Sequence, residues 1–176
     1  MGGQKANSGF HLGFLRVIEV GQDAHAGGLL VTNHLGRPLE FQCTTPVRPN
    51  RTQVILYGPT LEPFVWSELI GKTLCNRIDV KPHLILVDQP ALLEIREHVS
   101  MPVACIADRE ASGGDLPDVT RLQVGRNLLR FHNEFPEDRD DVSAAAGKIS
   151  SDADLLEPLE RVTEALRETL RTGAAA

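Results

Sequence analysis

The sequence is poor in cysteine, and the three cysteines that it has form no pattern. Cys43, Cys75 and Cys105 are odd in number, each lies in an apolar run, and none belongs to a C-x-x-C pair. This spacing argues against a disulfide framework and against a four-ligand zinc site. We therefore expect three small apolar side chains in a reducing compartment.

Long apolar segments are also missing. Residues 1–8 are polar and lack the apolar stretch that a secretory signal requires. The longest apolar runs elsewhere are short and interrupted, so none is expected to span a bilayer. The sequence predicts a soluble, cytoplasmic protein that makes no membrane contact.

The motifs of several common enzyme classes are absent as well. The chain contains no G-x-x-x-x-G-K-[ST], no G-x-G-x-x-G, no H-E-x-x-H and no G-x-S-x-G. These absences argue against a P-loop, a dinucleotide fingerprint, a zinc protease helix and a serine-hydrolase elbow. They leave open an active site without a short motif.

The chain has no excess of positive charge. The formal net charge is −6, and residues 133–160 alone carry nine acids and two bases. That stretch contributes −7, so the rest of the chain carries +1. A nearly neutral body attracts phosphate backbones weakly. We therefore do not expect nucleic acid as a partner.

What the chain does contain is the pattern of one α/β domain, with 176 residues of which 41% are hydrophobic. Segments 10–20, 28–32 and 39–45 have the composition of strands, and the turn at 33–38 joins the last two as a hairpin. A helix is predicted from Thr60, a continuous apolar strand at 84–87, a helix from Pro90 and a parallel strand at 103–106. Segment 120–131 has mixed periodicity and fits either a strand or a helix.

The predicted fold class is therefore α/β with a mixed sheet. Three antiparallel strands are followed by alternating helices and parallel strands, which is the order of the ribonuclease H-like fold. We place the α/β domain at 1–132, an acidic linker at 133–154 and an amphipathic C-terminal helix at 155–172. The apolar stripe of that helix packs on its own domain by default, and it is also the expected contact for a protein partner.

Asp88 is the sharpest candidate for chemistry, because it follows the apolar strand 84–87 and ligands of open α/β sheets lie beyond the carboxyl ends of strands. The segment Pro82-His83-Leu84-Ile85-Leu86-Val87-Asp88 resembles the Pro-x-Leu-x-Leu-Val-Asp strand of endonuclease V-type proteins in the ribonuclease H-like group. The resemblance implies clustered carboxylates that hold Mg²⁺ or Mn²⁺. It assigns Asp88, and Glu19 near the end of the first strand, as catalytic and metal-binding residues. Glu40 and Asp108 are candidates by position, and the rest of the chain resembles bacterial proteins of unassigned activity.

Each candidate site has a structural explanation beside the functional one. Asp88 directly precedes Gln89-Pro90, which is where an acidic helix N-cap belongs. Tyr57, Gly58 and Thr60 lie before a predicted helix, whose N-terminus offers backbone N–H groups to an anion. The same three residues also fit a simple capped turn.

Three hypotheses for function follow. The favoured one is a non-catalytic interaction or regulatory domain, for which no cofactor is expected. The second is a metal-dependent nuclease-like enzyme that uses Asp88, Glu19 and a third acid. The third is a small-molecule or nucleotide binder at the strand ends near Asp88 and residues 58–60. The nearly neutral body and the missing third acid favour the first, and whether the chain is an enzyme stays open.

Overall fold

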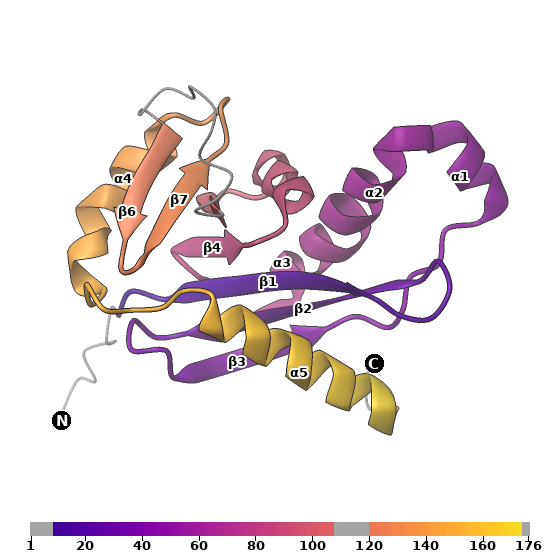
Figure 1. Cartoon of the computed structure of the whole chain (residues 1–176), viewed down its shortest axis with the longest axis horizontal. Coiled ribbons are helices and arrows are strands. Elements are labelled where there is room, and N and C mark those ends of the chain that lie inside the picture. The colour runs from indigo at the N-terminus through magenta and orange to yellow at the C-terminus, as the bar shows by residue number, and fades with distance from the viewer. Residues whose placement is uncertain (1–8, 108–119, 174–176) are drawn as a thin grey trace, which may run out of the picture.

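The computed structural model describes residues 9–107 and 120–173, and within them seven strands form one sheet in the order β3-β2-β1-β4-β5-β7-β6 (Figure 1). The first three strands form an antiparallel meander, and β4 and β5 continue the sheet parallel to β1. Their bounds are β1 Leu12–Glu19, β2 His25–Thr32, β3 Pro38–Cys43, β4 Leu84–Val87 and β5 Val103–Ile106. The mixed α/β sheet with ribonuclease H-like order is confirmed.

Segment 120–131 forms a hairpin of two strands, β6 Arg121–Val124 and β7 Asn127–Phe131. β7 pairs antiparallel with β5, so the hairpin extends the sheet at its far edge. Gly125 sits in the turn with φ of +55°, and a Cβ there would lie 2.4 Å from the carbonyl oxygen of Ala153. A glycine is therefore required both by the backbone conformation and by the close approach.

One face of the sheet is covered by the helices between β3 and β5. The chain runs through α1 Arg51–Tyr57, η1 Gly58–Thr60, α2 Leu61–Pro63, the π-helix η2 Phe64–Lys72, α3 Thr73–Arg77 and the 3-10 helix η3 Pro90–His98. Val65, Ile70 and Leu92 are buried against β-strand residues on this side. Gly27 permits the close packing, because a Cβ there would lie 2.1 Å from Ile70 Cγ2. In Figure 1, α1 lies at the end of an arm that extends away from the sheet.

The start of this helical region differs from the prediction. The first helix begins at Arg51 rather than at Thr60, since Asn50 is an N-cap whose side chain accepts a hydrogen bond from Gln53 N at 2.9 Å. Gln53 Oε1 accepts in return from Asn50 N at 3.0 Å, which completes a capping box. The Thr60 hydroxyl instead donates to the carbonyl of Tyr57, at 2.6 Å, and caps no helix.

The other face is covered by α4 Glu137–Ala145, η6 Ala146–Lys148 and α5 Glu157–Thr172. α5 folds back on its own domain, and Leu159, Val162 and Leu166 are fully buried against the sheet. It ends at Gly173, which has a φ of +68° and closes the last turn in a left-handed conformation. The apolar stripe of α5, which was also the expected contact for a protein partner, is therefore buried against the sheet of its own domain.

Residues 133–154, predicted as an acidic linker, are folded. They contain α4 and η6, and Val142 and Ile149 enter the core on the α5 face. Asp138 is buried and paired with Arg96 from η3. The composition was misleading because most of the segment is polar, although two of its apolar side chains are buried and one of its acids forms a buried ion pair.

No helix among residues 9–107 and 120–173 is long and apolar enough to cross a membrane.

Candidate functional site

Alternation along β1 and β4 places two charged side chains on the same face of the sheet. Phe14 on β1 and Leu86 on β4 both point into the core beneath α5, and they are partners in the parallel register. Arg16 follows Phe14 by two residues, and Asp88 follows Leu86 by two residues. Because side chains two apart share a face, these two charges lie side by side at the carboxyl end of β4.

Arg16 and Asp88 form an ion pair between Nη2 and Oδ2, and their side chains are 26% and 16% exposed. The guanidinium is also held by α5, since Nη1 donates to Thr163 Oγ1 at 3.0 Å and to the carbonyl of Leu159 at 3.3 Å. Three elements, β1, β4 and α5, therefore fix the position of this one cation.

Asp88 does not cap a helix. The helix η3 begins at Pro90 after Gln89, and no side chain caps it. Gln89 turns its amide to β1 instead, accepting from Val17 N and donating to Val17 O, both at 2.9 Å. The Gln89 amide thus bonds the backbone of β1 just beyond the end of β4. The Asp88 side chain faces Arg16 instead of the start of η3.

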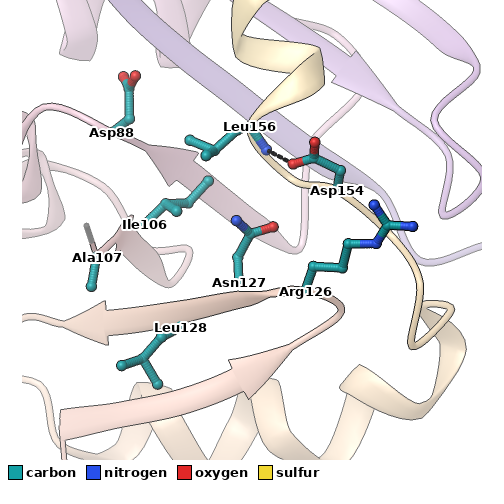
Figure 2. Close-up of a pocket in the computed structure, with 8 residues that line it drawn as sticks. All are labelled: Asp88, Ile106, Ala107, Arg126, Asn127, Leu128, Asp154 and Leu156. Carbon is teal, nitrogen blue, oxygen red and sulfur yellow. Dashed lines mark hydrogen bonds between the residues drawn. The ribbon is translucent and has the colours of Figure 1, made fainter. Parts of the chain in front are cut away.

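A cavity of about 500 Å³ opens beside Asp88 at the carboxyl ends of β4 and β5. Figure 2 shows the carboxylate at one end and Arg126, from the β6–β7 turn, at the other. Asp88 Oδ1 is buried and accepts no hydrogen bond within the described part of the chain. The lining combines polar and apolar side chains: Asp88, Ile106, Ala107, Arg126, Asn127, Leu128, Asp154 and Leu156.

The structure does not bring Glu19 next to Asp88. Glu19 is the exposed last residue of β1, paired in register with His25. It shares the parity of Leu15 and Val17, so it leaves the sheet on the face opposite Asp88. It is also three residues beyond Arg16, roughly 10 Å along the strand. In place of Glu19, the β1 side chain that meets Asp88 is Arg16.

The two further acids named by position do not complete the site either. Glu40 lies on β3, which is three strands from β4 and so about 14 Å away across the sheet. Its carboxylate accepts hydrogen bonds from Asp79 N at 3.0 Å and Val80 N at 2.8 Å. Burial alone would raise the pKa of Glu40, but these backbone bonds, with those from Gln42 and the charge of Lys81, lower it overall. Asp108 lies outside the described residues.

The donor set that the described residues place around Asp88 does not fit a divalent metal. Within residues 9–107 and 120–173, no three His, Cys, Asp or Glu side chains are grouped so that they could hold one. The Asp88 carboxylate is paired with a guanidinium, so the pair has no net charge to attract a dication. Two unit charges at 4 Å interact by about 4 kcal/mol near a protein surface, so the repulsion of a dication by Arg16 offsets its attraction to Asp88.

Tyr57 and Thr60 belong to a separate cavity of about 260 Å³ between α2, η2 and η3, which shares no lining residue with the Asp88 cavity. Tyr57 stacks on Phe64 with ring centroids 4.3 Å apart. Gly58, with φ of +51°, shapes the turn that presents them. Glu68 and Glu94 also line this cavity, which makes it a poor anion site. Ligand binding by Tyr57, Gly58 and Thr60 stays a prediction.

The cysteines are unsuited to nucleophilic catalysis. Cys75 and Cys105 are buried, and burial raises their pKa to about 12 and about 11. Cys43 is half-buried, and desolvation raises its pKa as well. All three are free thiols that stay protonated at neutral pH, as expected for small apolar side chains.

The fold has counterparts among solved structures. Endonuclease V from Ciona intestinalis, in complex with DNA containing an inosine, matches 95% of this chain and 88% of its own, with a TM-score of 0.53 at 9% identity. Endonuclease V from Bacillus subtilis matches 93% of this chain and 81% of its own, with a TM-score of 0.51 at 11% identity. The fold is that of endonuclease V. No family model matches the chain, and no curated protein matches it by sequence.

The comparison corrects one expectation. The expectation that nucleic acid is not a partner is contradicted, because endonuclease V structures with this fold were solved in complex with DNA. A net charge averages over the whole chain, whereas a ligand meets the side chains of one cavity, and Arg126 is among those that line this one. At 9% and 11% identity, the likeness to these structures establishes the fold.

Sequence reasoning missed Arg16, although a signal was present. It is a charged residue inside a strand whose neighbours Leu15 and Val17 are fully apolar and buried. An arginine in such a position needs a partner of opposite charge. The alternation of the strand then points to an acid at the same level of the adjacent strand.

Proposed function

We propose that this chain binds nucleic acid at the Asp88 cavity, on a fold shared with endonuclease V. The observation that carries the proposal is the likeness, over 95% of the chain, to an endonuclease V structure in complex with DNA. The place of the cavity supports it, since ligands of open α/β sheets bind beyond the carboxyl ends of the strands.

The chemistry of the cavity suits a nucleic acid strand. Arg126 lines the cavity and Arg16 contacts the lining residue Asp88, so both arginines bring N–H donors to this region, and Asn127 can both donate and accept hydrogen bonds. Ile106, Leu128 and Leu156 provide apolar surface between them. Phosphate contacts from arginine, combined with apolar packing, are the usual means of holding single-stranded segments.

Metal-dependent cleavage is a second candidate, and one observation favours it. Asp88 Oδ1 is buried at the cavity without a hydrogen-bond partner among the described residues, as a carboxylate that awaits a ligand would be. The similar solved structures are nucleases, which supports an Mg²⁺- or Mn²⁺-dependent reaction. Against it stands the ion pair with Arg16, which satisfies the other oxygen.

Binding is tested by fluorescence anisotropy with labelled single-stranded and duplex oligonucleotides of DNA and RNA, with and without inosine, over a series of salt concentrations. We expect Arg126→Gln to weaken binding and to reduce the salt slope by about 1. The matched control is Arg171→Gln, at the far end of α5, which should bind as the wild type does. Equal affinities for both variants would place the nucleic acid elsewhere.

Cleavage is tested on the same oligonucleotides with Mg²⁺ or Mn²⁺, using the wild type and Asp88→Asn. Metal-dependent cleavage that the variant loses would establish the second candidate. Binding by both proteins without cleavage supports a binding function, and the absence of any binding overturns the proposal.

A further inference from the structure

We infer that Arg16 supplies the cation of this site in place of a divalent metal, so that nucleic acid binds there without one. The inference rests on the proposed function for the nucleic acid, whereas the exclusion of metal can be measured on the protein alone. It starts from the disagreement between a fold shared with endonuclease V and a donor set that, over residues 9–107 and 120–173, does not fit a metal.

The position of Arg16 decides what β1 can contribute. A metal shared between β1 and β4 requires a β1 ligand on the same face and at the same level as Asp88. The register Phe14↔Leu86 and the alternation of side chains assign that position to residue 16. An arginine carries donors only and remains protonated, so β1 offers a cation where a metal would need an acceptor.

The guanidinium is held in place rather than free to swing aside. It donates to Asp88, to Thr163 and to the carbonyl of Leu159, which come from β4 and α5. α5 is in turn fixed by Leu159 and Val162 in the core, and Leu166 is buried as well. The folded chain therefore always carries this cation, whereas a metal ion would be present only when it is bound.

The remaining hydrogen-bonding capacity suits a phosphate. A guanidinium has five N–H donors, and hydrogen bonds to three acceptors of the described chain account for part of them. Arginine binds phosphate in a planar, bidentate manner. Asp88, which lines the cavity, accepts a hydrogen bond from Arg16 Nη2 and so acts as a positioning residue for Arg16.

The metal part is tested with Mn²⁺ alone, by electron paramagnetic resonance of the free ion and by thermal melts. We expect the wild type to bind no Mn²⁺ in a manner that Asp88→Asn abolishes. Arg16→Asp sets two carboxylates side by side, so it should gain Mn²⁺ binding and a rise in Tm of roughly 2–4 °C when the metal exceeds its Kd severalfold. The double variant R16D/D88N should lose that gain.

Arg167→Asp is the matched control, because it makes the same change of charge on the exposed side of α5. It should behave as the wild type toward Mn²⁺. Wild-type Mn²⁺ binding that Asp88→Asn abolishes would overturn the inference, and this result does not depend on whether Arg16→Asp folds.

The nucleic acid part is tested by anisotropy in EDTA and in Mg²⁺. Equal affinity under both conditions, with a severalfold loss and a salt slope lower by about 1 in Arg16→Gln, supports Arg16 as the cation. Binding only with Mg²⁺ overturns it. If no nucleic acid binds under either condition, the proposed function fails, while the Mn²⁺ measurement still decides whether Arg16 excludes the metal.

Discussion

Two arginine–aspartate ion pairs in this protein differ in how completely the aspartate is hydrogen-bonded. Arg96 and Asp138 join η3 to α4 through two bonds, Nε to Oδ2 at 2.6 Å and Nη2 to Oδ1 at 3.0 Å. Arg96 also donates to the carbonyl of Val99 and lies 4.0 Å from the centroid of the Phe135 ring. The Asp138 side chain is 2% exposed, and both of its oxygens are satisfied.

Arg16 and Asp88 share only one carboxylate oxygen. Asp88 Oδ1 stays buried without a partner in the described structure, and Asp88 lines a cavity. A pair that satisfies every atom holds two elements together, whereas a pair that leaves capacity unused at a cavity is prepared for a ligand. The difference separates a structural pair from a candidate site within one chain.

The largest effect is expected from Asp138→Asn. Removing one charge of a buried pair leaves Arg96 uncompensated, which costs about 3 kcal/mol. The measurement is urea unfolding of the variant beside the wild type, and nucleic acid binding should not change at a temperature where the variant is folded. A loss below about 1 kcal/mol would mean that the stacking on Phe135 and the Val99 carbonyl hold Arg96 without the acid.

Asp88→Asn should cost less, about 1 kcal/mol, because the amide oxygen still accepts from Arg16 and the site is partly open to solvent. Urea unfolding gives this value on the same scale. We expect the larger effect of Asp88→Asn to be a loss of nucleic acid affinity, since Arg16 loses the carboxylate that orients it. Equal stability losses for Asp88→Asn and Asp138→Asn would remove the distinction between the two pairs.

Glu40→Gln tests a carboxylate that accepts hydrogen bonds from the backbone N–H groups of Asp79 and Val80 and from the Gln42 side chain. Its folded pKa is lowered, so its stabilisation is present above the unfolded pKa near 4.5 and is lost as the pH falls through the folded pKa. We expect the variant to be less stable by about 1 kcal/mol at pH 7. Unfolding curves of both proteins should converge in acid, and a constant difference at all pH values would refute the assignment.

The smallest effect is expected from Thr163→Val. The substitution removes one hydrogen bond to Arg16 and keeps the shape of the side chain, at a cost of about 0.5–1 kcal/mol. Thermal melts measure this cost. Anisotropy at low salt should show a modest loss of nucleic acid binding if α5 positions the cation, and unchanged binding would show that Asp88 suffices.

Local patterns predicted most of the sheet. The apolar run 84–87, the alternation in the first strands and the Pro90 helix start all lie where the structure has them, because strand and turn preferences act over a few residues. The prediction failed where tertiary contacts override composition. Residues 133–154 are rich in acids and yet fold, since Val142 and Ile149 are buried and Asp138 has Arg96 as its partner.

The candidate site was predicted in part. Asp88 stands at the strand end indicated by its resemblance to endonuclease V-type proteins, and its cavity lies there. Glu19 was chosen because it ends the first strand, but its parity sends it to the other face. A residue's position in a strand fixes its face only once the register of the neighbouring strand is known.

By itself, the sequence determined the five strands β1 to β5, their order along the chain and the acid that follows β4, because each depends on a few adjacent residues. Only the tertiary structure decided that Arg16, rather than another acid, meets Asp88. That contact joins residues 72 positions apart. It depends on the parallel register of β1 with β4 and on the packing of α5, neither of which a local pattern encodes.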